Sequence, residues 1–169
     1  GIEANTGSLG QGLSIALGIS LGLRLDKNPG RVYVILGDGE LAEGQIWEAA
    51  MAAANFGVDN LVAIVDQNRA QATGMIVERF NTNPLVSKWE AFGWQTLQIN
   101  GHNVEEIIEA LDEADEVKGK PVVIIAETVK GKGFSFAEHK AAYHNAALSQ
   151  EEYETALADL EEIKKSLSR

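Results

Sequence analysis

The chain contains three short, uninterrupted apolar runs, and these constrain its fold more than any other feature. They occupy residues 31–36 (RVYVIL), 61–66 (LVAIVD) and 121–128 (PVVIIAET) and are rich in β-branched side chains. A strand that is apolar on both faces is typical of a parallel sheet, because crossover helices cover both faces of such a sheet. Helix-length segments separate the runs. The sequence therefore predicts an α/β fold, a parallel β-sheet with helices on both faces.

The segments around these runs have the patterns of helices and loops. Helices are expected at residues 8–25, 42–55, 87–92, 104–118 and 149–167, and a further strand is expected at residues 95–99. Two stretches without a regular pattern, residues 68–87 and 130–145, are expected to be loops.

Finer expectations concern three of the helices. Ser87 is expected to cap the short helix 87–92. Ser149 and Glu152 have the spacing of a capping box at the start of helix 149–167. In helix 104–118 the apolar residues that share one face are Val104, Ile107, Ile108 and Leu111.

Size and charge narrow the kinds of protein that this chain can be. Its 169 residues suffice for one domain with a sizeable core, and we expect a single domain over residues 1–169. The opening GIEANTGSLGQG leads almost at once into an apolar helix, which predicts that this domain lacks its first elements. The formal net charge of −11 disfavours nucleic acid as a partner, because phosphate backbones attract basic surfaces.

Two absences from the sequence also bear on its class. The chain has no cysteine, which excludes disulfides, thiolate zinc sites and cysteine nucleophiles and fits a cytoplasmic protein. No apolar run is long enough to cross a bilayer, so no membrane partner is expected.

An aspartate between two glycines follows the first strand-like run, at Gly37-Asp38-Gly39. Asn68 lies just past the next such run, one crossover helix later. If the two strands are neighbours in a parallel sheet, both side chains emerge at the same edge. A carboxylate, an amide oxygen and a nearby carbonyl suit Mg²⁺ or Ca²⁺ and leave positions open for phosphate oxygens.

The Gly-Asp-Gly tripeptide alone is most often a tight turn. Its combination with Asn68 at the next strand end favours a metal diphosphate site instead. The glycines beside Asp38 would let the backbone approach a diphosphate closely.

Several stretches resemble the transketolase family. Gly-Asp-Gly with a later Asn is the thiamine-diphosphate motif, and GDGELAEGQIWEAAMAAANFGVDNLVAIVDQN looks like that family's version of it. TGSLGQG resembles the family's glycine-rich turn under the cofactor's pyrimidine ring, and TVKGKGFSF with a later YHN resembles the end of the same domain. The likeness is strongest to the N-terminal subunit of transketolases split over two chains. It implies the thiamine-diphosphate-binding fold.

The resemblance assigns roles to individual positions. Asp38 and Asn68 would bind the metal through their side chains and Ala70 through its carbonyl. The backbone at Gly37 and Gly39 would approach the diphosphate. The positions implied for the pyrimidine and the thiazolium are Gly7 and Leu9, through main-chain atoms, and Ala72, through apolar packing.

Three further positions are implied with a specific alternative. Glu43 matches a catalytic and cofactor-side acid near the dimer interface, linked to its twin through Glu48 and water, although acids near a helix start also complement the helix dipole. His144, in Tyr143-His144-Asn145, stands where the family often has Trp-His-Gly, and its imidazole would reach toward the thiazolium and the substrate. Lys130 would meet phosphates, although solvated loop lysines are common.

The resemblance also implies partners and a function. In the family, a glutamate from a second, pyrimidine-binding domain activates the cofactor, and nothing in this sequence corresponds to that domain. We therefore expect a thiamine-diphosphate- and Mg²⁺-binding subunit that needs a separate pyrimidine-binding C-terminal subunit, as a homodimer or heterotetramer. With that partner it would transfer a two-carbon ketol unit between sugar phosphates.

Two alternatives remain open at this point. The chain could be a non-catalytic remnant that no longer binds cofactor. It could also belong to another thiamine enzyme, such as a deoxyxylulose-phosphate synthase or a 2-oxo-acid dehydrogenase component, although the stretch ELAEGQIWEA favours the transketolase branch.

Overall fold

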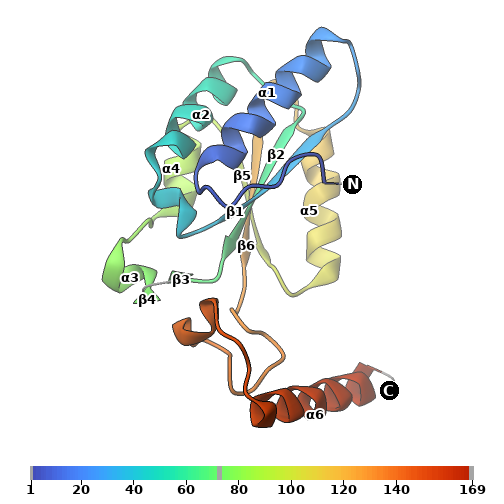
Figure 1. The fold of residues 1–169 in the computed structure, drawn as a ribbon. Helices are drawn as coiled ribbons and strands as arrows, with labels where there is room; N and C mark the ends of the chain where they lie inside the picture. The colour runs from blue at the N-terminus through green and yellow to red at the C-terminus, as the bar shows by residue number, and fades with distance from the viewer. Residues whose placement is uncertain (1, 72–73, 168–169) are drawn as a thin grey trace.

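The computed structural model describes residues 2–71 and 74–167, and within them the chain forms a four-stranded sheet. Its strands are β1 (Val32–Gly37), β2 (Leu61–Gln67), β5 (Gln95–Asn100) and β6 (Val122–Glu127), in the order β1-β2-β6-β5 (Figure 1). Every pairing in this sheet is parallel, as the apolar runs predicted. The two strands that precede the predicted site residues, β1 and β2, are neighbours.

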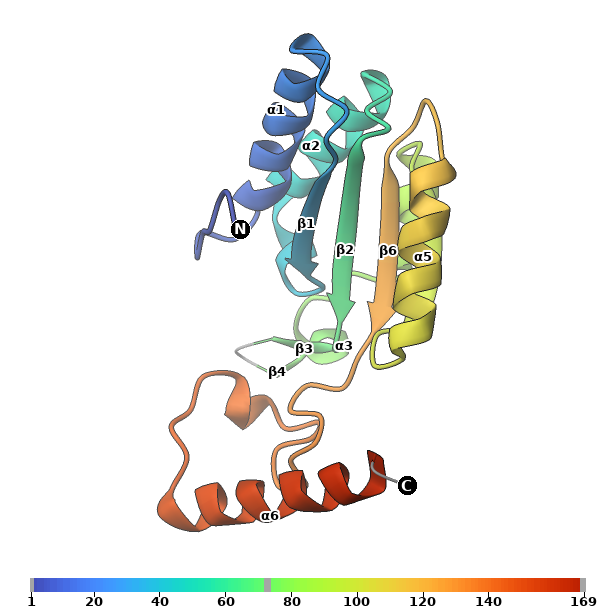
Figure 2. The same ribbon diagram turned by 90° about the vertical axis from the view of Figure 1, so that its right-hand side faces the viewer.

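Helices lie on both faces of the sheet, which confirms the predicted α/β class (Figure 1, Figure 2). One face carries α1 (Gln11–Leu25), α2 (Gly44–Asn55) and α4 (Leu85–Ala91). The other face carries α5 (Val104–Glu116).

The larger core lies between the sheet and the three helices α1, α2 and α4, and tryptophans fill its centre. The ring centroid of Trp89 lies 5.1 Å from that of Trp47 and 4.8 Å from that of Trp94. The indole N–H of Trp94 donates to the carbonyl of Ala50 at 2.9 Å. The side chains of α2 that face this core are mostly alanines, which leaves room for the large rings.

The smaller core lies under α5, and the predicted apolar face of this helix is only partly covered. Alanines, Ala110 and Ala114, make the closest approach to the sheet. Val104 and Ile108 are 69% and 55% exposed, because the helix turns its small side chains toward the strands. The helix ends at Glu116, two residues before the predicted end.

Three boundaries differ from the prediction where turns intervene. α1 begins at Gln11 rather than at residue 8, because the preceding Gly10 has a left-handed φ of 88°. α2 begins at Gly44 rather than at residue 42, because a short 3₁₀ helix, η1 (Glu40–Ala42), precedes it. The predicted cap at Ser87 was wrong: Pro84 is the N-cap residue of α4, which begins at Leu85, so Ser87 lies inside the first turn of the helix.

The predicted loop at residues 68–87 contains regular structure. β3 (Ala70–Gln71) and β4 (Gly74–Met75) form an antiparallel pair, and α3 (Ile76–Arg79) follows. Elements of this length show no periodicity in a sequence, so only the packed structure reveals them.

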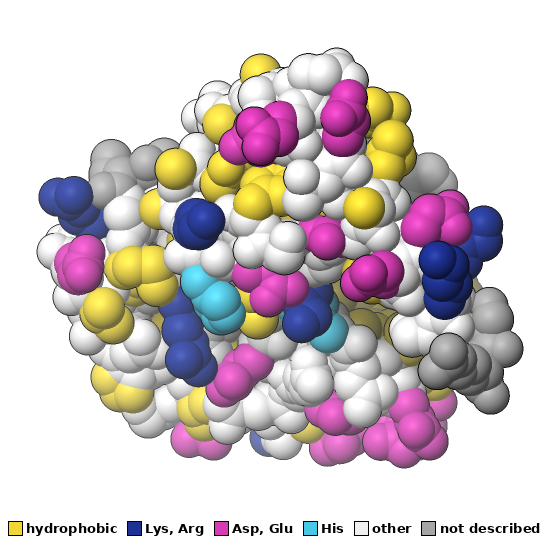
Figure 3. Space-filling model, turned by 90° about the horizontal axis from the view of Figure 1, so that it is seen from below, with side chains coloured by type: hydrophobic (Ala, Val, Ile, Leu, Met, Phe, Trp, Pro, Cys, Tyr) yellow, Lys and Arg dark blue, Asp and Glu magenta, His cyan; other side chains and the backbone are white. Residues whose placement is uncertain are grey.

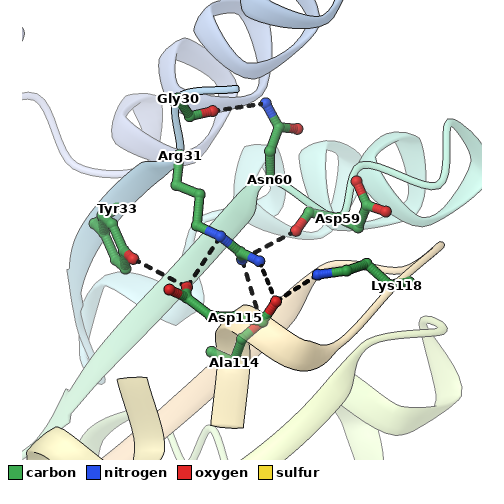
Figure 4. A network of polar contacts seen from close by, with 8 residues as sticks. All are labelled: Gly30, Arg31, Tyr33, Asp59, Asn60, Ala114, Asp115 and Lys118. Carbon is green, nitrogen blue, oxygen red and sulfur yellow. Dashed lines mark hydrogen bonds and ion pairs between the residues drawn. The ribbon is translucent and has the colours of Figure 1, made fainter. Parts of the chain in front are cut away.

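A polar network joins β1, β2 and α5 at the ends of the strands opposite to Gly37 (Figure 4). Arg31 pairs with Asp115 at 2.9 Å, and its guanidinium donates to the carbonyls of Asp59 and Ala114 at 3.2 Å. Over its described length, α5 has no basic residue in its last turn. Arg31 therefore supplies the positive charge that the terminal carbonyls of α5 favour.

After β6 the chain leaves the sheet as an arm, residues 128–167, which contains η2 (Ala141–His144) and α6 (Gln150–Leu167) (Figure 2). The predicted capping box is confirmed: Glu152 N–H donates to Ser149 Oγ at 3.2 Å, and Ser149 N–H donates to Glu152 Oε2 at 2.8 Å. The backbone and hydroxyl of Ser135 donate to Asp159, which holds α6 against the loop before it. Across residues 2–71 and 74–167, no helix combines the length and apolarity needed to cross a membrane.

Replacement of Trp89 by alanine is expected to lower the free energy of unfolding by about 3–5 kcal/mol, because it leaves a cavity in the centre of the larger core. Denaturation by urea, followed by far-ultraviolet circular dichroism, measures this change. Val104→Ala, at an exposed helix position, is the control and should alter stability by less than about 0.5 kcal/mol. A loss below about 1 kcal/mol for Trp89→Ala would contradict the packing described above.

Candidate functional site

The parallel pairing of β1 with β2 brings the two predicted site segments to one edge of the sheet. Gly37 is in register with Asp66, at the carboxyl ends of the two strands. The backbone N–H of Asp38 donates to the carbonyl of Asp66 at 3.2 Å, and Asn68 follows β2 directly. Both side chains therefore leave the sheet at its carboxyl edge, where the sequence placed them.

Asp38 is a buried carboxylate. Its side chain is 2% exposed, and Oδ2 accepts a hydrogen bond of 2.7 Å from the backbone N–H of Arg69. Burial raises its pKa to about 6; the charge of Asp66 adds to this rise, and the backbone amides of Arg69 and Gly39 oppose it. No basic side chain of the described residues forms an ion pair with Asp38. A cation bound at this position would offset the unfavourable burial of the charge.

Asn68 is held in a turn next to Asp38. Its Nδ2 donates to Asp66 Oδ2 at 3.0 Å, and its Oδ1 accepts from the backbone N–H of Ala70 at 3.0 Å. Asp66 in turn accepts from the hydroxyl of Thr128, at the start of the arm. The three residues predicted as metal ligands thus lie within one hydrogen-bonded arrangement.

Gly39 lies against Gln71, with no room for a side chain between them. A β-carbon on Gly39 would come within 2.8 Å of Gln71 Cγ. The Nε2 atom of Gln71 is buried and has no hydrogen-bond acceptor among the described residues. An unpaired buried donor costs on the order of 1–3 kcal/mol, so this place fits an anionic ligand.

The glycine-rich turn of residues 6–12 lies beside η1 and the start of α2. The backbone N–H of Gly10 donates to Glu40 Oε1 at 2.9 Å. A β-carbon on Gly10 would come within 2.8 Å of Glu43 Cβ. Gly7 and Leu9, the residues predicted to meet the pyrimidine, are exposed, Leu9 by 60%.

The remaining predicted residues lie around this edge without a direct bond to Asp38. Glu43 is the exposed N-cap residue of α2, and its side chain makes no capping hydrogen bond. Lys130 lies in the arm, where its carbonyl accepts from the N–H of His139. His144 is exposed on η2, which packs against β3 and β4. Ala72 lies outside the described residues.

An open groove adjoins Asn68 at the carboxyl ends of β2, β5 and β6. Its volume is about 680 Å³, and its lining includes Arg69, His102, Glu127 and His139. Arg69 pairs with Glu127 at 3.4 Å. Viewed from below, histidine and basic side chains lie close to acidic ones (Figure 3). Asn68 lines this groove, whereas Asp38 does not.

Comparison with known protein families identifies the family of this chain. The family described as "Transketolase, thiamine diphosphate binding domain" matches residues 1–160. The chain belongs to the transketolase family. Its cofactor is thiamine diphosphate, as the Gly-Asp-Gly motif and the glycine-rich turn predicted.

Curated relatives of this transketolase domain are named as subunits. It is 48% identical over 161 residues to the 6-deoxy-6-sulfo-D-fructose transketolase subunit SqwG of Clostridium sp. (strain MSTE9), a match that covers 95% of this chain and 58% of that relative. It is 43% identical over 162 residues to one of the apulose-4-phosphate transketolase subunits of Phocaeicola vulgatus, a match that covers 96% of this chain and 58% of that relative. The resemblance to a transketolase subunit is confirmed, and the chain spans little more than half the length of these relatives.

A solved transketolase has the same fold. The transketolase from Campylobacter jejuni matches with a TM-score of 0.86 and 35% sequence identity, over 92% of this chain and 26% of that chain. The predicted thiamine-diphosphate-binding fold is therefore confirmed.

The oxygen donors at this edge have the chemistry that suits a hard metal ion. Residues 2–71 and 74–167 contain no group of three or more His, Cys, Asp or Glu side chains able to hold a metal. One buried carboxylate, one amide oxygen and a carbonyl leave the other coordination positions to phosphate oxygens and water. That division is typical of Mg²⁺.

Several polar side chains at this edge were not expected from the sequence. Glu40 stands three residues after Gly37, the spacing at which a glutamate reaches back to a backbone N–H in a capping box, so a signal was present. Asp66 ends the second apolar run, and its parallel register with Gly37 was also foreseeable. The position of Gln71 depends on the β3–β4 pair, which no pattern indicated.

The raised pKa of Asp38 predicts how pH affects the stability of the metal-free protein. The folded carboxyl holds its proton up to about pH 6, whereas the unfolded carboxyl holds it only up to 3.8. The folded state therefore binds more protons between these values, and this group's contribution to the free energy of unfolding rises as the pH falls from about 7 to about 4. Asp38→Asn cannot ionise, so at pH 7.5 it should be more stable than the unmodified chain.

Urea unfolding of both proteins with a chelator present measures this difference. The advantage of Asp38→Asn should be about 3 kcal/mol at about pH 7.5 and about half of that at pH 5. Carboxyl groups that do not interact with Asp38 titrate equally in both proteins, so the difference between the two proteins reports on Asp38 and its neighbour Asp66. An advantage that does not change with pH would refute the buried, uncompensated carboxylate.

Proposed function

We propose that this chain is the diphosphate-side, thiamine-diphosphate- and Mg²⁺-binding component of a transketolase that transfers a two-carbon ketol unit between sugar phosphates. The observation that carries the proposal is Asp38, which is buried at the Gly-Asp-Gly turn and hydrogen-bonded to the turn of Asn68, in a chain of the transketolase family. In this proposal residues 1–169 act as a single domain.

In this proposal Asp38 and Asn68 bind Mg²⁺ through side-chain oxygens and Ala70 binds it through its carbonyl. The Oδ1 atom of Asn68 has two lone pairs, so it can keep its bond from the N–H of Ala70 while it binds the metal. The small number of protein ligands favours Mg²⁺ over Ca²⁺, which takes more oxygen ligands from the protein.

The neighbouring backbone would receive the rest of the cofactor. Gly37 and Gly39 would face the diphosphate, and the unpaired Nε2 of Gln71 is a donor beside it. Lys130 is proposed as a further phosphate contact. The residues proposed to meet the pyrimidine and the thiazolium are Gly7, Leu9 and Ala72.

Thiamine diphosphate, when bound, supplies the reactive carbon that cleaves and forms carbon–carbon bonds. The chain's own residues hold and orient it. The imidazole of His144 is proposed to hold or transfer a proton near the substrate. The reason is that η2 packs against β3, which begins at Ala70, and against β4.

A separate pyrimidine-binding subunit completes the proposed enzyme. The curated relatives named above are subunits of transketolases, which supports a partner of this kind. Glu43 is exposed beside the glycine-rich turn, and we place it with Glu48 at an interface, in a homodimer or a heterotetramer. The absence of cysteine fits a cytoplasmic enzyme.

The names of the relatives support sugar phosphates or similarly anionic sugars as substrates. One relative is named for 6-deoxy-6-sulfo-D-fructose and the other for apulose 4-phosphate. The same comparisons favour a transketolase over a deoxyxylulose-phosphate synthase or a 2-oxo-acid dehydrogenase component.

Asp38→Ala is expected to weaken the binding of thiamine diphosphate in the presence of Mg²⁺ by on the order of a hundredfold, because the metal loses its only carboxylate ligand. Isothermal titration calorimetry of the purified protein with its partner subunit measures the affinity, and a ketol-transfer assay measures activity. Glu116→Gln, which removes an exposed charge far from the site, is the control and should bind normally.

Unchanged binding by Asp38→Ala would exclude the proposed metal site. If the unmodified protein binds no cofactor even with its partner, the chain is a remnant that keeps the motif without the function.

A further inference from the structure

Glu40 joins the two segments that lie on either side of the proposed cofactor site. Its Oε1 accepts from the backbone N–H of Gly10 at 2.9 Å, and its Oε2 accepts from the backbone N–H of Gly37 at 3.0 Å. Gly10 lies in the glycine-rich turn, directly before α1, and Gly37 is the first residue of the Gly-Asp-Gly turn. A single carboxylate therefore connects two turns that are far apart in the sequence.

We propose that Glu40 is a positioning residue for thiamine diphosphate, one that fixes the distance between the turn for the pyrimidine and the turn for the diphosphate. This inference rests on the proposed function, which assigns Gly7 and Leu9 to one end of the cofactor and Asp38 to the other. Glu40 itself does not have to touch the cofactor, because it acts through the two backbone amides.

The chemistry of the contact suits this task. A carboxylate that accepts from backbone N–H groups makes stronger hydrogen bonds than a neutral acceptor does. Both of its oxygens are used, and no Lys or Arg side chain of the described residues forms an ion pair with it. Glu40 is half-buried, so water competes only partly for these amides.

The side-chain hydrogen bonds inside the glycine-rich turn are local: Ser8 N–H donates to Thr6 Oγ1 at 3.0 Å, and Gln11 Nε2 donates to Ser8 Oγ at 3.2 Å. Gly10 is the N-cap residue of α1, and it has no side chain to accept from the first N–H groups of the helix. Its left-handed φ of 88° also requires a residue that tolerates this backbone. Packing fixes α1 behind the turn, and the backbone N–H of Gly10 itself is held by Glu40, a group from elsewhere in the chain.

Glu43 acts on the same turn in a different way. A β-carbon on Gly10 would come within 2.8 Å of Glu43 Cβ, so Glu43 restricts the position of the turn by van der Waals contact. Glu40 restricts the position of the turn by its hydrogen bond to Gly10, and its second hydrogen bond, to Gly37, connects the turn to the end of β1. The loss of Glu40 should therefore loosen the connection between the turns without removing either turn.

The test compares Glu40→Gln with the unmodified protein, each with its partner subunit. An amide offers one acceptor oxygen and one NH₂ donor, so one of the two backbone N–H groups loses its partner. In the presence of Mg²⁺, the affinity for thiamine diphosphate should fall about tenfold or more. The affinity for inorganic pyrophosphate, which does not need the glycine-rich turn, should fall by less than about threefold.

Two further variants serve as comparisons. Glu116→Gln removes the same charge at an exposed position and should change neither affinity. Glu40→Asp keeps the carboxylate on a shorter side chain, so its affinity for thiamine diphosphate should lie between that of the unmodified protein and that of Glu40→Gln. It also replaces Glu40→Gln in the comparison if the amide variant does not fold.

Equal losses for thiamine diphosphate and pyrophosphate would overturn the connecting role, and so would an unchanged affinity for thiamine diphosphate. Amide hydrogen exchange without cofactor gives a separate measurement: at least one of Gly10 and Gly37 should exchange faster in Glu40→Gln, and neither should in Glu116→Gln. If the unmodified protein binds no cofactor, the proposed function fails and the cofactor role of Glu40 fails with it. The exchange rates then show whether Glu40 still connects the two turns, and unchanged rates would overturn that connection too.

Discussion

The site depends on the parallel hydrogen-bonded register between β1 and β2. Because Gly37 pairs with Asp66, the turns after the two strands leave the sheet side by side, and Asp38 reaches the turn of Asn68. A shift of one residue would send alternate side chains to the other face and would separate these groups. At the opposite ends of the strands, Arg31 connects the start of β1 to α5 and to Asp59, two residues before β2, so the register is held from both ends.

The same register concentrates negative charge at the carboxyl edge. Asp38 and Asp66 lie close enough for the charge of Asp66 to contribute to the raised pKa of Asp38. A fold selected only for stability would place an apolar or neutral side chain at a position as buried as that of Asp38. The carboxylate therefore costs stability in the free protein, a common compromise at functional sites, and in the proposed function a cation would neutralise it.

The sequence was sufficient for features that extend over many residues. The continuously apolar strands predicted a parallel sheet, and the alternation with helices placed Asp38 and Asn68 at one edge. It was insufficient where short elements or packing decide the outcome. The β3–β4 pair and η1 are too short to show a period, and Pro84 rather than Ser87 precedes α4. Val104 and Ile108 follow a helical apolar pattern, yet the approach of α5 through its alanines leaves both exposed.

The parts of the site that were hardest to predict are those in which a side chain acts on the main chain. Glu40 bonds to the backbone N–H groups of two glycines, and Asp38 bonds to that of Arg69. Backbone groups leave no mark in the sequence beyond the glycines that let the chain approach closely. A cofactor that is held largely by main-chain atoms needs those atoms in fixed positions before it arrives. In this chain the carboxylates of Glu40 and Asp38, at the carboxyl edge of the sheet, hold backbone N–H groups in fixed positions. These side chains therefore matter for the backbone that they position as well as for their charge.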